Sequence, residues 1–568
     1  MTTLKRPNIF TLLHGLGQLQ RLPHRFRFER AKNAPERAQA RRLEAITTLS
    51  KDTKFAREHG LGSVRTLREL QQRVPVQDGE SLKPWVEREM RGERHTLCAE
   101  TPVLYASSTG TTGVPKRMPI TESFRREFQT SLLTSMAYTY DRYRDAFSGS
   151  ILYYVSKKEI DRSADGTPIG FTSGFNFSRM PKLVQKAYAV PYETFEVKDP
   201  RTRSYLTTWL SALSPVTVIG AIFPLAVTEM LRSVEGEGEA LVRDLRAGSL
   251  RDDLQLSGAE RSYFSSFARI DAKAADRIEQ ACRACGGKLT GPAIFPALKL
   301  LYCWTSASAG HYVDQARAAL PPGVAVADGV YAANEGWCNI PLADGELGGP
   351  VSIHGHFYEF VEESAWDRGV REGVGTEALE PGKSYRILLT TSAGVFRYDV
   401  GDIVACSGFY GRTPRIHFSR RAGASYSLAG EKLSEVHVQR AVAKVASELG
   451  VSPAFFSAVP IASAPPRWEM FIEFPEMLSS EALSRWRAAL DTELGRECVD
   501  YADRLGFHLR PIALRVLPPG AYTQYRRAQA DAGAPTAQSK VVNLETRANA
   551  FAALGHTTLV EKEGEPRS

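Results

Sequence analysis

Cysteine is scarce in this sequence: the 568 residues include seven cysteines, which are odd in number and widely scattered. This argues against a disulfide framework and favours a reducing compartment. Cys282 and Cys285 form a CxxC pair in a helix-like stretch that ends in glycine, and no second ligand pair accompanies them. We therefore expect both cysteines to have a structural role, because a metal site would need further ligands.

Long hydrophobic runs are also missing. The most apolar longer stretch, SPVTVIGAIFPLAV (214–227), is too short to span a bilayer and contains Pro224. The first residues show no small-residue cleavage site of a secretory signal. The sequence therefore predicts a cytoplasmic protein with no membrane partner.

Several catalytic signatures are absent as well. The chain has no GxxxxGK[ST] phosphate loop, no GxGxxG dinucleotide motif, no GxSxG nucleophile elbow and no HExxH zinc helix. His354 and His356 alternate in SIHGHFYEF, so we expect them on one face of a strand. Two histidines without a third ligand are more often ordinary strand residues than a metal site.

Positively charged residues outnumber negatively charged ones. The chain carries a net charge of +8 with a pI near 9.0, and residues 1–44 contain ten Lys/Arg against three Glu. Residues 1–37 are therefore expected to form a basic N-terminal arm. We find no basic stripe mixed with aromatic residues in the rest of the chain, so no nucleic-acid partner is expected.

The remaining pattern is that of a globular α/β protein, with 43% hydrophobic and 24% charged residues. Residues 35–95 look helical, VLYA (103–106) is a short strand, and 121–143 reads as a long helix with Thr121 as its N-cap. Strand-like and helix-like stretches alternate from about 215 to 400. We predict a large multi-sheet domain over 38–425 and a small, mobile α/β domain over 426–568.

One stretch suggests an anion-binding loop. STGTTGVPK (108–116) is expected between a strand and a helix, where backbone N–H groups and hydroxyls can converge on a phosphate. Lys116 supplies a positive charge at a fixed distance. Pro115 stands where a P-loop has its glycine, so this is not a P-loop; a flexible loop is the alternative.

Four later segments carry suitable chemistry, although each is weak alone. Tyr331 and Glu335 in VYAANEGW could stack on a base and bind Mg²⁺ through phosphate. Asp402, in a turn after the strand of FRYDVGDIV, could accept hydrogen bonds from a ribose diol. A basic, glycine-bearing link covers 419–435, and Lys540 lies in a late loop, GAPTAQSKVV.

In this order, the segments resemble the motifs of the adenylate-forming superfamily: [ST]SGTTGxPK, YxxxE, the aspartate motif, the hinge and the C-terminal lysine. From about residue 38 to 545 the chain is more closely similar to the GH3 family of acyl acid–amido synthetases. That similarity includes KRMPIT, LKLLYCWTSASAGHY before VYAANEGW, TTSAGVFRYDVGDIVACSGFYGRTPRIHFSRR, and GAPTAQSK.

The resemblance implies the adenylate-forming fold and a two-step ligase reaction. A carboxylic acid attacks the α-phosphate of ATP to form an acyl-adenylate, and an amine, usually of an amino acid, then displaces AMP. Mg²⁺ is implied at Glu335, adenine at Tyr331 and ribose at Asp402, with Arg421 and Lys432 on the hinge side. Thr111, Glu335 and Lys540 are the implied catalytic residues. Phosphate is implied at Lys116 and at Ser107, Ser108, Thr109, Gly110, Thr111 and Thr112.

Departures from the family pattern leave the substrates open. Leu428, Ala429 and Gly430 stand where plant members commonly have an acidic residue, and Val-Val-Asn follows Lys540 in place of Thr-Pro-Arg. The segment 165–180 matches no plant acyl pocket, so auxin and jasmonate are not assumed. Two alternatives remain: transfer of the acyl group to coenzyme A, and a non-catalytic adenylate-binding protein. The oligomeric state is also open, a monomer included.

Overall fold

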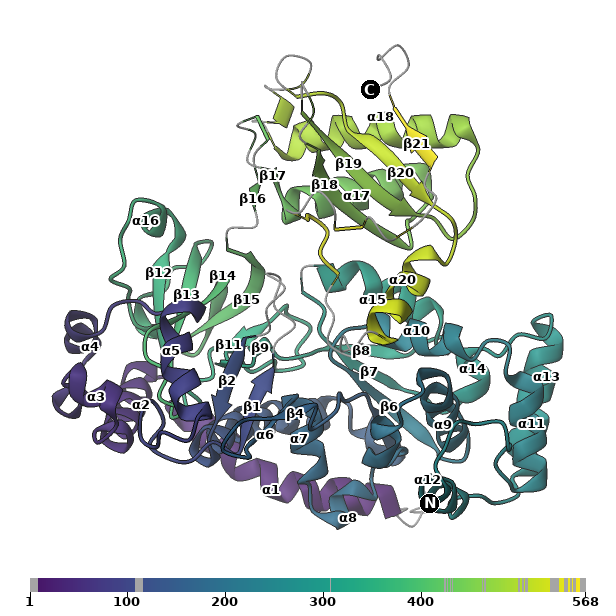
Figure 1. The fold of residues 1–568 in the computed structure, drawn as a ribbon, viewed down its shortest axis with the longest axis horizontal. Helices are drawn as coiled ribbons and strands as arrows, with labels where there is room; N and C mark the ends of the chain where they lie inside the picture. Colours follow the sequence, from purple (N-terminus) through teal and green to yellow (C-terminus); the bar gives the residue numbers. More distant parts are fainter. Residues whose placement is uncertain are drawn as a thin grey trace, which may run out of the picture. The chain divides into compact units, whose positions relative to one another are not determined.

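The computed structural model forms two compact units, a first unit from Met1 to Ser419 and a second unit from Arg420 to Ser568 (Figure 1). The structure describes residues 9–107, 116–306, 308–422, 425–426, 428–429, 431, 433–461, 463, 466–498, 501–502, 505, 509–531, 541–545, 550–551, 554 and 558–561. The predicted α/β class is confirmed, because both units combine sheets with covering helices. No helix among the described residues is long and apolar enough to cross a membrane.

The helical start of the first unit is confirmed. Side-chain caps fix two of its helices, since Thr66 forms a capping box with Glu69 and Asp78 forms one with Ser81. The segment expected as a basic arm is largely a helix, α1, that contacts α6. The elements are α1 (Ile9–Ala31), α2 (Pro35–Ser50), α3 (Lys54–Glu58), η1 (Leu61–Ser63), α4 (Leu67–Arg73) and α5 (Gly79–Met90).

A four-stranded sheet carries the start of the expected phosphate loop. Its order is β2-β1-β5-β4, with β1 (Leu104–Ser107) antiparallel to β2 (Arg117–Ile120) and parallel to β5 (Pro168–Gly170); β4 is Asp161–Arg162. The loop was expected to lead into a helix, but it joins two paired strands, and α6 (Glu122–Arg142) follows β2. β2 was not predicted, because it contains Pro119 and proline is rare in strands. It is an edge strand of this sheet, where proline is tolerated. Thr121 caps α6 as predicted.

A buried parallel sheet forms the centre of the first unit. Its order is β3-β6-β7-β8, and the six residues of β6 are all buried. Such continuous apolar strands are typical of sheets with both faces covered. The strands are β3 (Ser150–Tyr153), β6 (Val216–Ala221), β7 (Leu300–Cys303) and β8 (Ala325–Asp328). The helices and turns are η2 (Arg144–Ser148), α7 (Thr172–Ser178), α8 (Lys182–Gln185), η3 (Tyr192–Glu196), α9 (Pro200–Ala212), α10 (Leu225–Ser233), α11 (Gly238–Ala247), α12 (Gly258–Ser265), α13 (Ala272–Ala284), α14 (Gly291–Ile294) and α15 (Ser308–Ala318).

A five-stranded sheet, in the order β11-β15-β14-β13-β12, completes the first unit. A buried ion pair lies within this sheet, where the Arg397 guanidinium donates to Glu359 at 2.8 and 2.9 Å. The same guanidinium fastens the sheet to the helical start by donating to the Val74 carbonyl at 2.7 Å. The elements are β9 (Ala332–Ala333), β10 (Gly336–Trp337), β11 (Gly349–Pro350), β12 (Phe357–Glu362), α16 (Glu363–Asp367), η4 (Thr376–Ala378), β13 (Ser384–Thr390), β14 (Tyr398–Tyr410) and β15 (Thr413–Arg421).

The expected strand position of two histidines is wrong. His354 and His356 lie in the turn before β12, which begins at Phe357. Their rings have different partners, because His356 faces Glu127 at 2.7 Å and His354 faces the Arg27 carbonyl at 3.3 Å. The alternating pattern here reflects a turn held by contacts with α6 and α1.

The second unit is a small α/β domain with its own core. Its sheet has the order β18-β19-β20-β21, and its two longer helices, α17 and α18, contact each other. The apolar face of α18 includes the buried side chains of Trp486, Leu490 and Leu494. The elements are β16 (Ser425–Tyr426), β17 (Leu433–Ser434), α17 (Glu435–Leu449), β18 (Phe455–Ile461), β19 (Arg467–Glu473), α18 (Ser480–Glu497), β20 (Ala513–Leu517), α20 (Ala521–Asp531) and β21 (Thr558–Val560).

Candidate active site

The carboxyl ends of the central parallel strands present polar groups at one edge of the sheet. Strand β8 ends at Asp328, whose carboxylate accepts hydrogen bonds from the N–H and hydroxyl of Thr305, at 3.1 and 2.6 Å. Thr305 follows the end of β7. Burial raises the pKa of Asp328 above its ordinary value, and these hydrogen bonds oppose the rise. Ligands of α/β sheets commonly bind at this edge.

Tyr331 follows β8 and meets Asp402 from the antiparallel sheet. The Tyr331 hydroxyl donates to Asp402 Oδ2 at 2.8 Å, and both side chains are buried. The Tyr331 N–H donates to Asn339 Oδ1 at 2.9 Å, and its ring lies 5.7 Å from that of Phe418. Two motifs that are 71 residues apart in sequence are therefore joined by a direct hydrogen bond.

Asp402 was expected in a turn after a strand, but it lies within β14. Leu388 of β13 pairs with Asp399, whereas Arg386 pairs with Ile403, so β14 has two more residues than β13 between these pairs. Gly401 adopts a positive φ of 80° in this bulge, and its N–H donates to the Asp399 carboxylate at 2.8 Å. Bulges redirect side chains next to functional sites. The bulge places Asp402 beside Tyr331.

Glu335 lies at the turn of a tight hairpin. Strands β9 and β10 pair Ala333 with Gly336, so only Asn334 and Glu335 connect them. The Asn334 amide donates to the Ser107 carbonyl at 3.1 Å, and its oxygen accepts from the Thr172 hydroxyl at 3.2 Å. The hairpin is thus attached to the end of β1, where the expected phosphate loop begins. Asn334 was not predicted, although it directly precedes a predicted carboxylate.

The carboxylates of Asp402 and Glu335 both influence the pKa of the Cys338 thiol. Burial raises the pKa of the Cys338 thiol well above its ordinary value, and the negative charges of Asp402 and then Glu335 raise it further. Two carboxylates near one buried group produce a negative local potential, which favours a cation. A carboxylate combined with phosphate oxygens and water is a donor set that suits Mg²⁺. Among the described residues, no three His, Cys, Asp or Glu side chains gather as a ready-made metal site.

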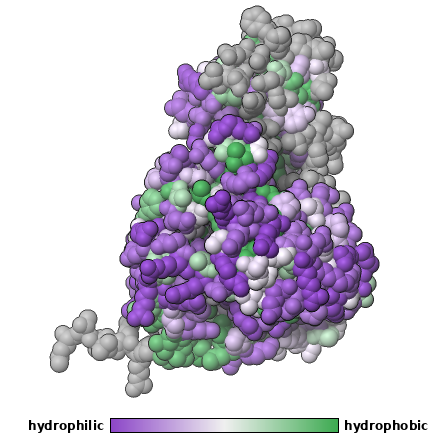
Figure 2. Space-filling view, turned by 90° about the vertical axis from the view of Figure 1, so that its left-hand side faces the viewer, coloured by the Kyte–Doolittle hydropathy of each residue, from purple (hydrophilic) through white to green (hydrophobic). Residues whose placement is uncertain are grey.

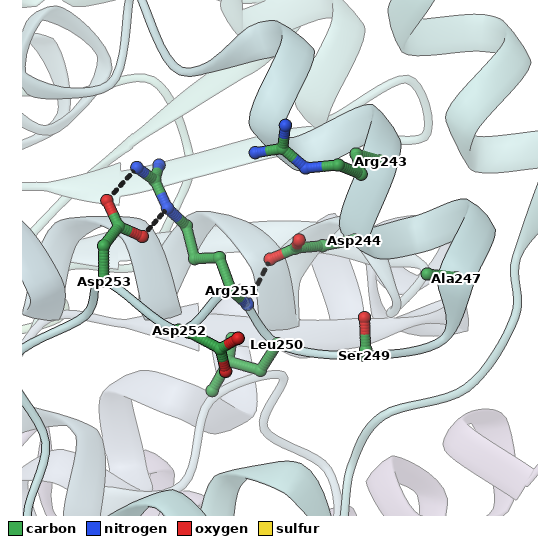
Figure 3. A pocket seen from close by; sticks show the side chains of 8 residues that line it. All are labelled: Arg243, Asp244, Ala247, Ser249, Leu250, Arg251, Asp252 and Asp253. Carbon is green, nitrogen blue, oxygen red and sulfur yellow. Dashed lines mark hydrogen bonds and ion pairs between the residues drawn. The ribbon is translucent and has the colours of Figure 1, made fainter.

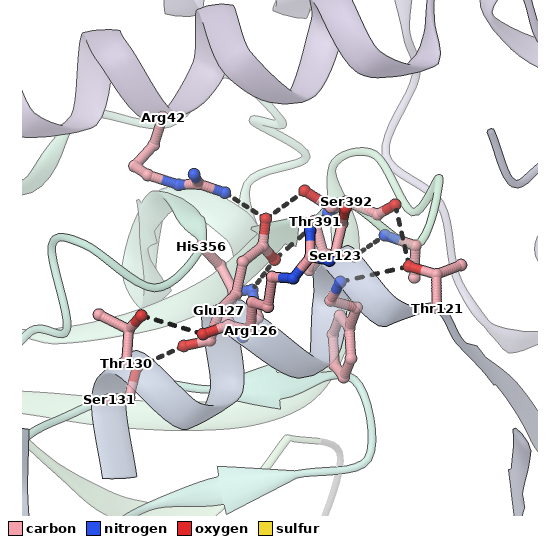
Figure 4. A network of polar contacts seen from close by, with 12 residues as sticks. Arg42, Thr121, Ser123, Arg126, Glu127, Thr130, Ser131, His356, Thr391 and Ser392 are labelled. Atoms are coloured by element: carbon pink, nitrogen blue, oxygen red, sulfur yellow. Dashed lines mark hydrogen bonds and ion pairs between the residues drawn. The ribbon is translucent and has the colours of Figure 1, made fainter. Parts of the chain in front are cut away.

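A buried polar network supports the hairpin from α6 (Figure 4). Glu127 accepts hydrogen bonds from Arg42, from the Ser392 hydroxyl and from His356 Nδ1, the last at 2.7 Å. The His356 ring lies so close to Gly336 that a Cβ there would be 2.8 Å from its Cδ2. A side chain at position 336 would therefore either push the His356 ring away or shift the backbone beside Glu335. Glu127 was not predicted, because no motif includes it.

Lys116 has a defined neighbour in the structure. Its side chain runs along Gly79, where an added Cβ would be 2.8 Å from Lys116 Cε. It lies beside Asp78, whose pKa is lowered first by the Ser81 N–H and also by the Lys116 charge. The predicted contact between Lys116 and phosphate stays a prediction.

Seven predicted site residues fall outside the described residues. They are Ser108, Thr109, Gly110, Thr111, Thr112, Lys432 and Lys540. Ser107 ends β1 and is buried, and Arg421 is the last residue of β15 and is half-buried.

The chain directly after Lys540 is firmly held within the second unit. Asn543 donates through its N–H to Glu435 at 2.7 Å and through its side chain to the Phe456 carbonyl at 2.8 Å, and its own carbonyl accepts from the Ala458 N–H at 2.9 Å. Val541 is buried. This anchor was not predicted, because its contacts come from distant parts of the chain.

A pocket of about 530 Å³ in the first unit contains none of the predicted site residues (Figure 3). Asp244 accepts from the Arg251 N–H at 2.9 Å and from the Tyr205 hydroxyl at 2.8 Å, and Arg251 also pairs with Asp253. Within this pocket, Arg251 and Asp253 therefore offset each other's charge. The pocket is lined by Arg243, Asp244, Ala247, Ser249, Leu250, Arg251, Asp252 and Asp253.

Three domain models of one protein family match successive parts of the chain. The GH3 family N-terminal domain matches residues 25–324, the central domain matches 349–421 and the C-terminal domain matches 436–548. The chain belongs to the GH3 family. The GH3 central domain includes Asp402 and the GH3 C-terminal domain includes Lys540, whereas Tyr331 and Glu335 lie between the matched segments.

Two curated GH3 relatives are from Arabidopsis thaliana. The chain is 26% identical over 427 residues to indole-3-acetic acid-amido synthetase GH3.3, covering 72% of this chain and 71% of the relative. It is 25% identical over 544 residues to probable indole-3-acetic acid-amido synthetase GH3.1, covering 91% and 90%. A solved structure, GH3.15 acyl acid amido synthetase, matches with a TM-score of 0.83 at 19% identity, covering 95% of this chain and 97% of that one. The expected fold is therefore confirmed.

Proposed function

We propose that this GH3 chain is an ATP-dependent acid–amine ligase that forms an amide by way of an acyl-adenylate. The observation that carries the proposal is the Tyr331–Asp402 hydrogen bond, because it joins the expected adenine and ribose motifs in one buried site. Asn334 links the adjoining Glu335 hairpin to Ser107. Three separately predicted motifs therefore belong to one part of the first unit.

The first step is attack of a carboxylate oxygen of the acid on the α-phosphorus of ATP. The bond from that phosphorus to the bridging oxygen breaks, and pyrophosphate leaves. Asp402 is proposed to accept hydrogen bonds from the ribose hydroxyls, and Tyr331 to lie against the adenine. Residues Ser107 to Thr112 and Lys116 are proposed to donate to the phosphates, with Thr111 and Lys540 facing the charge that develops in the reaction.

Glu335 is the proposed ligand of Mg²⁺, which when bound offsets negative charge on the phosphates. In the second step an amine nitrogen attacks the acyl carbon, the bond to AMP breaks, and the amine proton passes to solvent or a base. Arg421 and Lys432 are proposed to line the hinge between a large domain ending at residue 425 and the small domain. Because the reaction consumes ATP, we place it in the cytoplasm.

The acid is tested by ATP–pyrophosphate exchange with a panel of aromatic and aliphatic carboxylic acids. At least one acid should support exchange, and the Asp402→Ala variant should exchange poorly at an ATP concentration that is limiting for the native enzyme. Exchange with none of the acids would favour a non-catalytic adenylate-binding protein.

The acceptor is tested with the best acid by supplying amino acids, other amines or coenzyme A in turn. Amide formation with release of AMP is expected from an amino acid. Thioester formation with coenzyme A, and no amide from any amine, would establish the acyl-CoA synthetase alternative.

A further inference from the structure

Helix α1 is docked by a mostly polar face, which also includes the buried Phe28. His14 and Gln18 are buried, and His14 Nε2 lies 3.0 Å from the Gly149 carbonyl while the Gln18 amide donates to the Ala137 carbonyl at 3.2 Å. Arg25 pairs with Asp141 at the end of α6. Polar groups that are buried and hydrogen-bonded fix a helix in one orientation. Because these contacts hold one face of α1 against the rest of the unit, the opposite face is turned outward.

That outward face is apolar. Five side chains of α1 are each between 53% and 64% exposed: Ile9, Leu12, Leu16, Leu19 and Phe26. Spacings of three, four and seven residues place them in one stripe, which extends roughly 26 Å along the helix. Leu183 and Val184 of α8, which contacts α1, are also exposed. We call these seven residues the α1 surface. An apolar area lies along the lower edge of the view in Figure 2, the edge along which α1 runs in Figure 1.

The exposed charged side chains on α1 and at α8 are positive, whereas the partly buried Glu29 of α1 pairs with Lys32. Arg27 and Arg30 are exposed on α1, and Lys182 and Lys186 are exposed on either side of Leu183 and Val184. In the sequence, Lys5 and Arg6 precede the helix. A second copy of the same surface would bring like charges together, which disfavours self-association. An anionic partner is favoured instead.

We propose that the α1 surface binds the interface of an anionic lipid bilayer. An amphipathic helix lying in the plane of a membrane buries a stripe of Leu, Ile and Phe in the acyl boundary, while Lys and Arg contact the headgroups. The expectation of no membrane partner rested on the absence of a spanning segment, and an interfacial helix does not need one. An acidic protein would be another anionic partner, but it is less favoured, because one straight apolar stripe flanked by Lys and Arg is the pattern of a helix that lies in a membrane plane.

The test is flotation of the full chain with vesicles of phosphatidylcholine alone or mixed with phosphatidylglycerol. The native protein should bind the anionic vesicles at least about tenfold more tightly, and added salt should weaken that binding. The double variant Leu16→Glu, Leu19→Glu should lose binding, and Lys182→Gln with Lys186→Gln should weaken it about tenfold or more.

The matched control is Ile270→Glu, because Ile270 is 70% exposed in the first unit but lies outside the α1 surface. It should bind like the native chain, and circular dichroism should show that every variant is folded. Equal binding to neutral vesicles, no binding to either, or equal loss in the Ile270 variant would overturn the proposal. A dimer in light scattering that the Leu16 and Leu19 substitutions abolish would assign the surface to a second copy and overturn it as well.

Discussion

At the scale of single residues, Asp402 combines burial with a defined partner. Its carboxylate accepts from the Tyr331 hydroxyl, and Gly401 gives the strand the bulge that holds it there. Since a carboxylate has two oxygens with several acceptor positions, one contact with Tyr331 is compatible with further hydrogen bonds to a ribose. The residue is therefore the most direct place to test the nucleotide site.

We expect Asp402→Asn to raise the KM for ATP by roughly ten- to a hundredfold, the effect of losing a hydrogen bond to a charged group. The measurement is ATP–pyrophosphate exchange at varied ATP. Tyr331→Phe retains the ring and removes only the hydroxyl, so its effect should be smaller. An unchanged KM in the Asp402 variant would remove this residue from the ribose site.

The sequence identified Tyr331, Glu335 and Asp402 one by one, because each has a side chain suited to nucleotide or metal chemistry. It did not identify Asn334 or Glu127, since their roles depend on contacts with residues more than two hundred positions away. An amide or a carboxylate inside an ordinary stretch carries no local signal of such a partner. These supporting residues became visible only through tertiary structure.

At the scale of elements, the helices were predictable from apolar spacing and caps, as Thr121 at the start of α6 illustrates. Strands were less so. Strand β2 was not predicted because it contains Pro119. Asp402 was predicted in a turn because the glycine of the β14 bulge directly precedes it. Pairing partners decide where a strand begins and bulges, and the local sequence does not contain them.

A buried ion pair that joins two elements allows a stability prediction. Replacing Glu359 of β12 with Gln leaves the buried Arg397 guanidinium without its carboxylate, so the free energy of unfolding should fall by about 3 kcal/mol. Urea unfolding followed by tryptophan fluorescence measures this loss.

The control for that variant is Glu362→Gln in the same strand. Glu362 forms an exposed pair with Lys383, and its loss should change stability by no more than about 0.5 kcal/mol. If both variants were equally stable, the Glu359–Arg397 pair would not be a main stabilising contact of β12.

At the scale of the whole molecule, the proposed site residues come from both compact units. Tyr331, Glu335 and Asp402 belong to the first unit, and Lys540 belongs to the second. Sequence similarity predicted that the site residues come from two domains, because the motifs occur along the chain in the same order as in the family. Periodicity alone predicted two α/β regions without assigning them a shared reaction.

Lys540→Ala should abolish most acid-dependent pyrophosphate release while ATP binding to the first unit persists, because we propose that the charge of Lys540 stabilises the transition state. Pyrophosphate release and equilibrium binding of ATP are measured on the same preparation. Arg527→Ala, a change at another cation of the second unit, serves as the control and should release pyrophosphate normally. Near-native release by the Lys540 variant would contradict its catalytic role.

The anchor formed by Asn543 has a kinetic consequence. Lys540 is bonded directly to the buried Val541, so their Cα atoms lie about 3.8 Å apart. Because the anchor ties residues 541–543 to β18 and α17, this described stretch of backbone moves only together with the folded second unit. We therefore expect the proposed approach of Lys540 to a phosphate to follow motion of the whole second unit, on the microsecond-to-millisecond scale, and not the faster fluctuations of a loop.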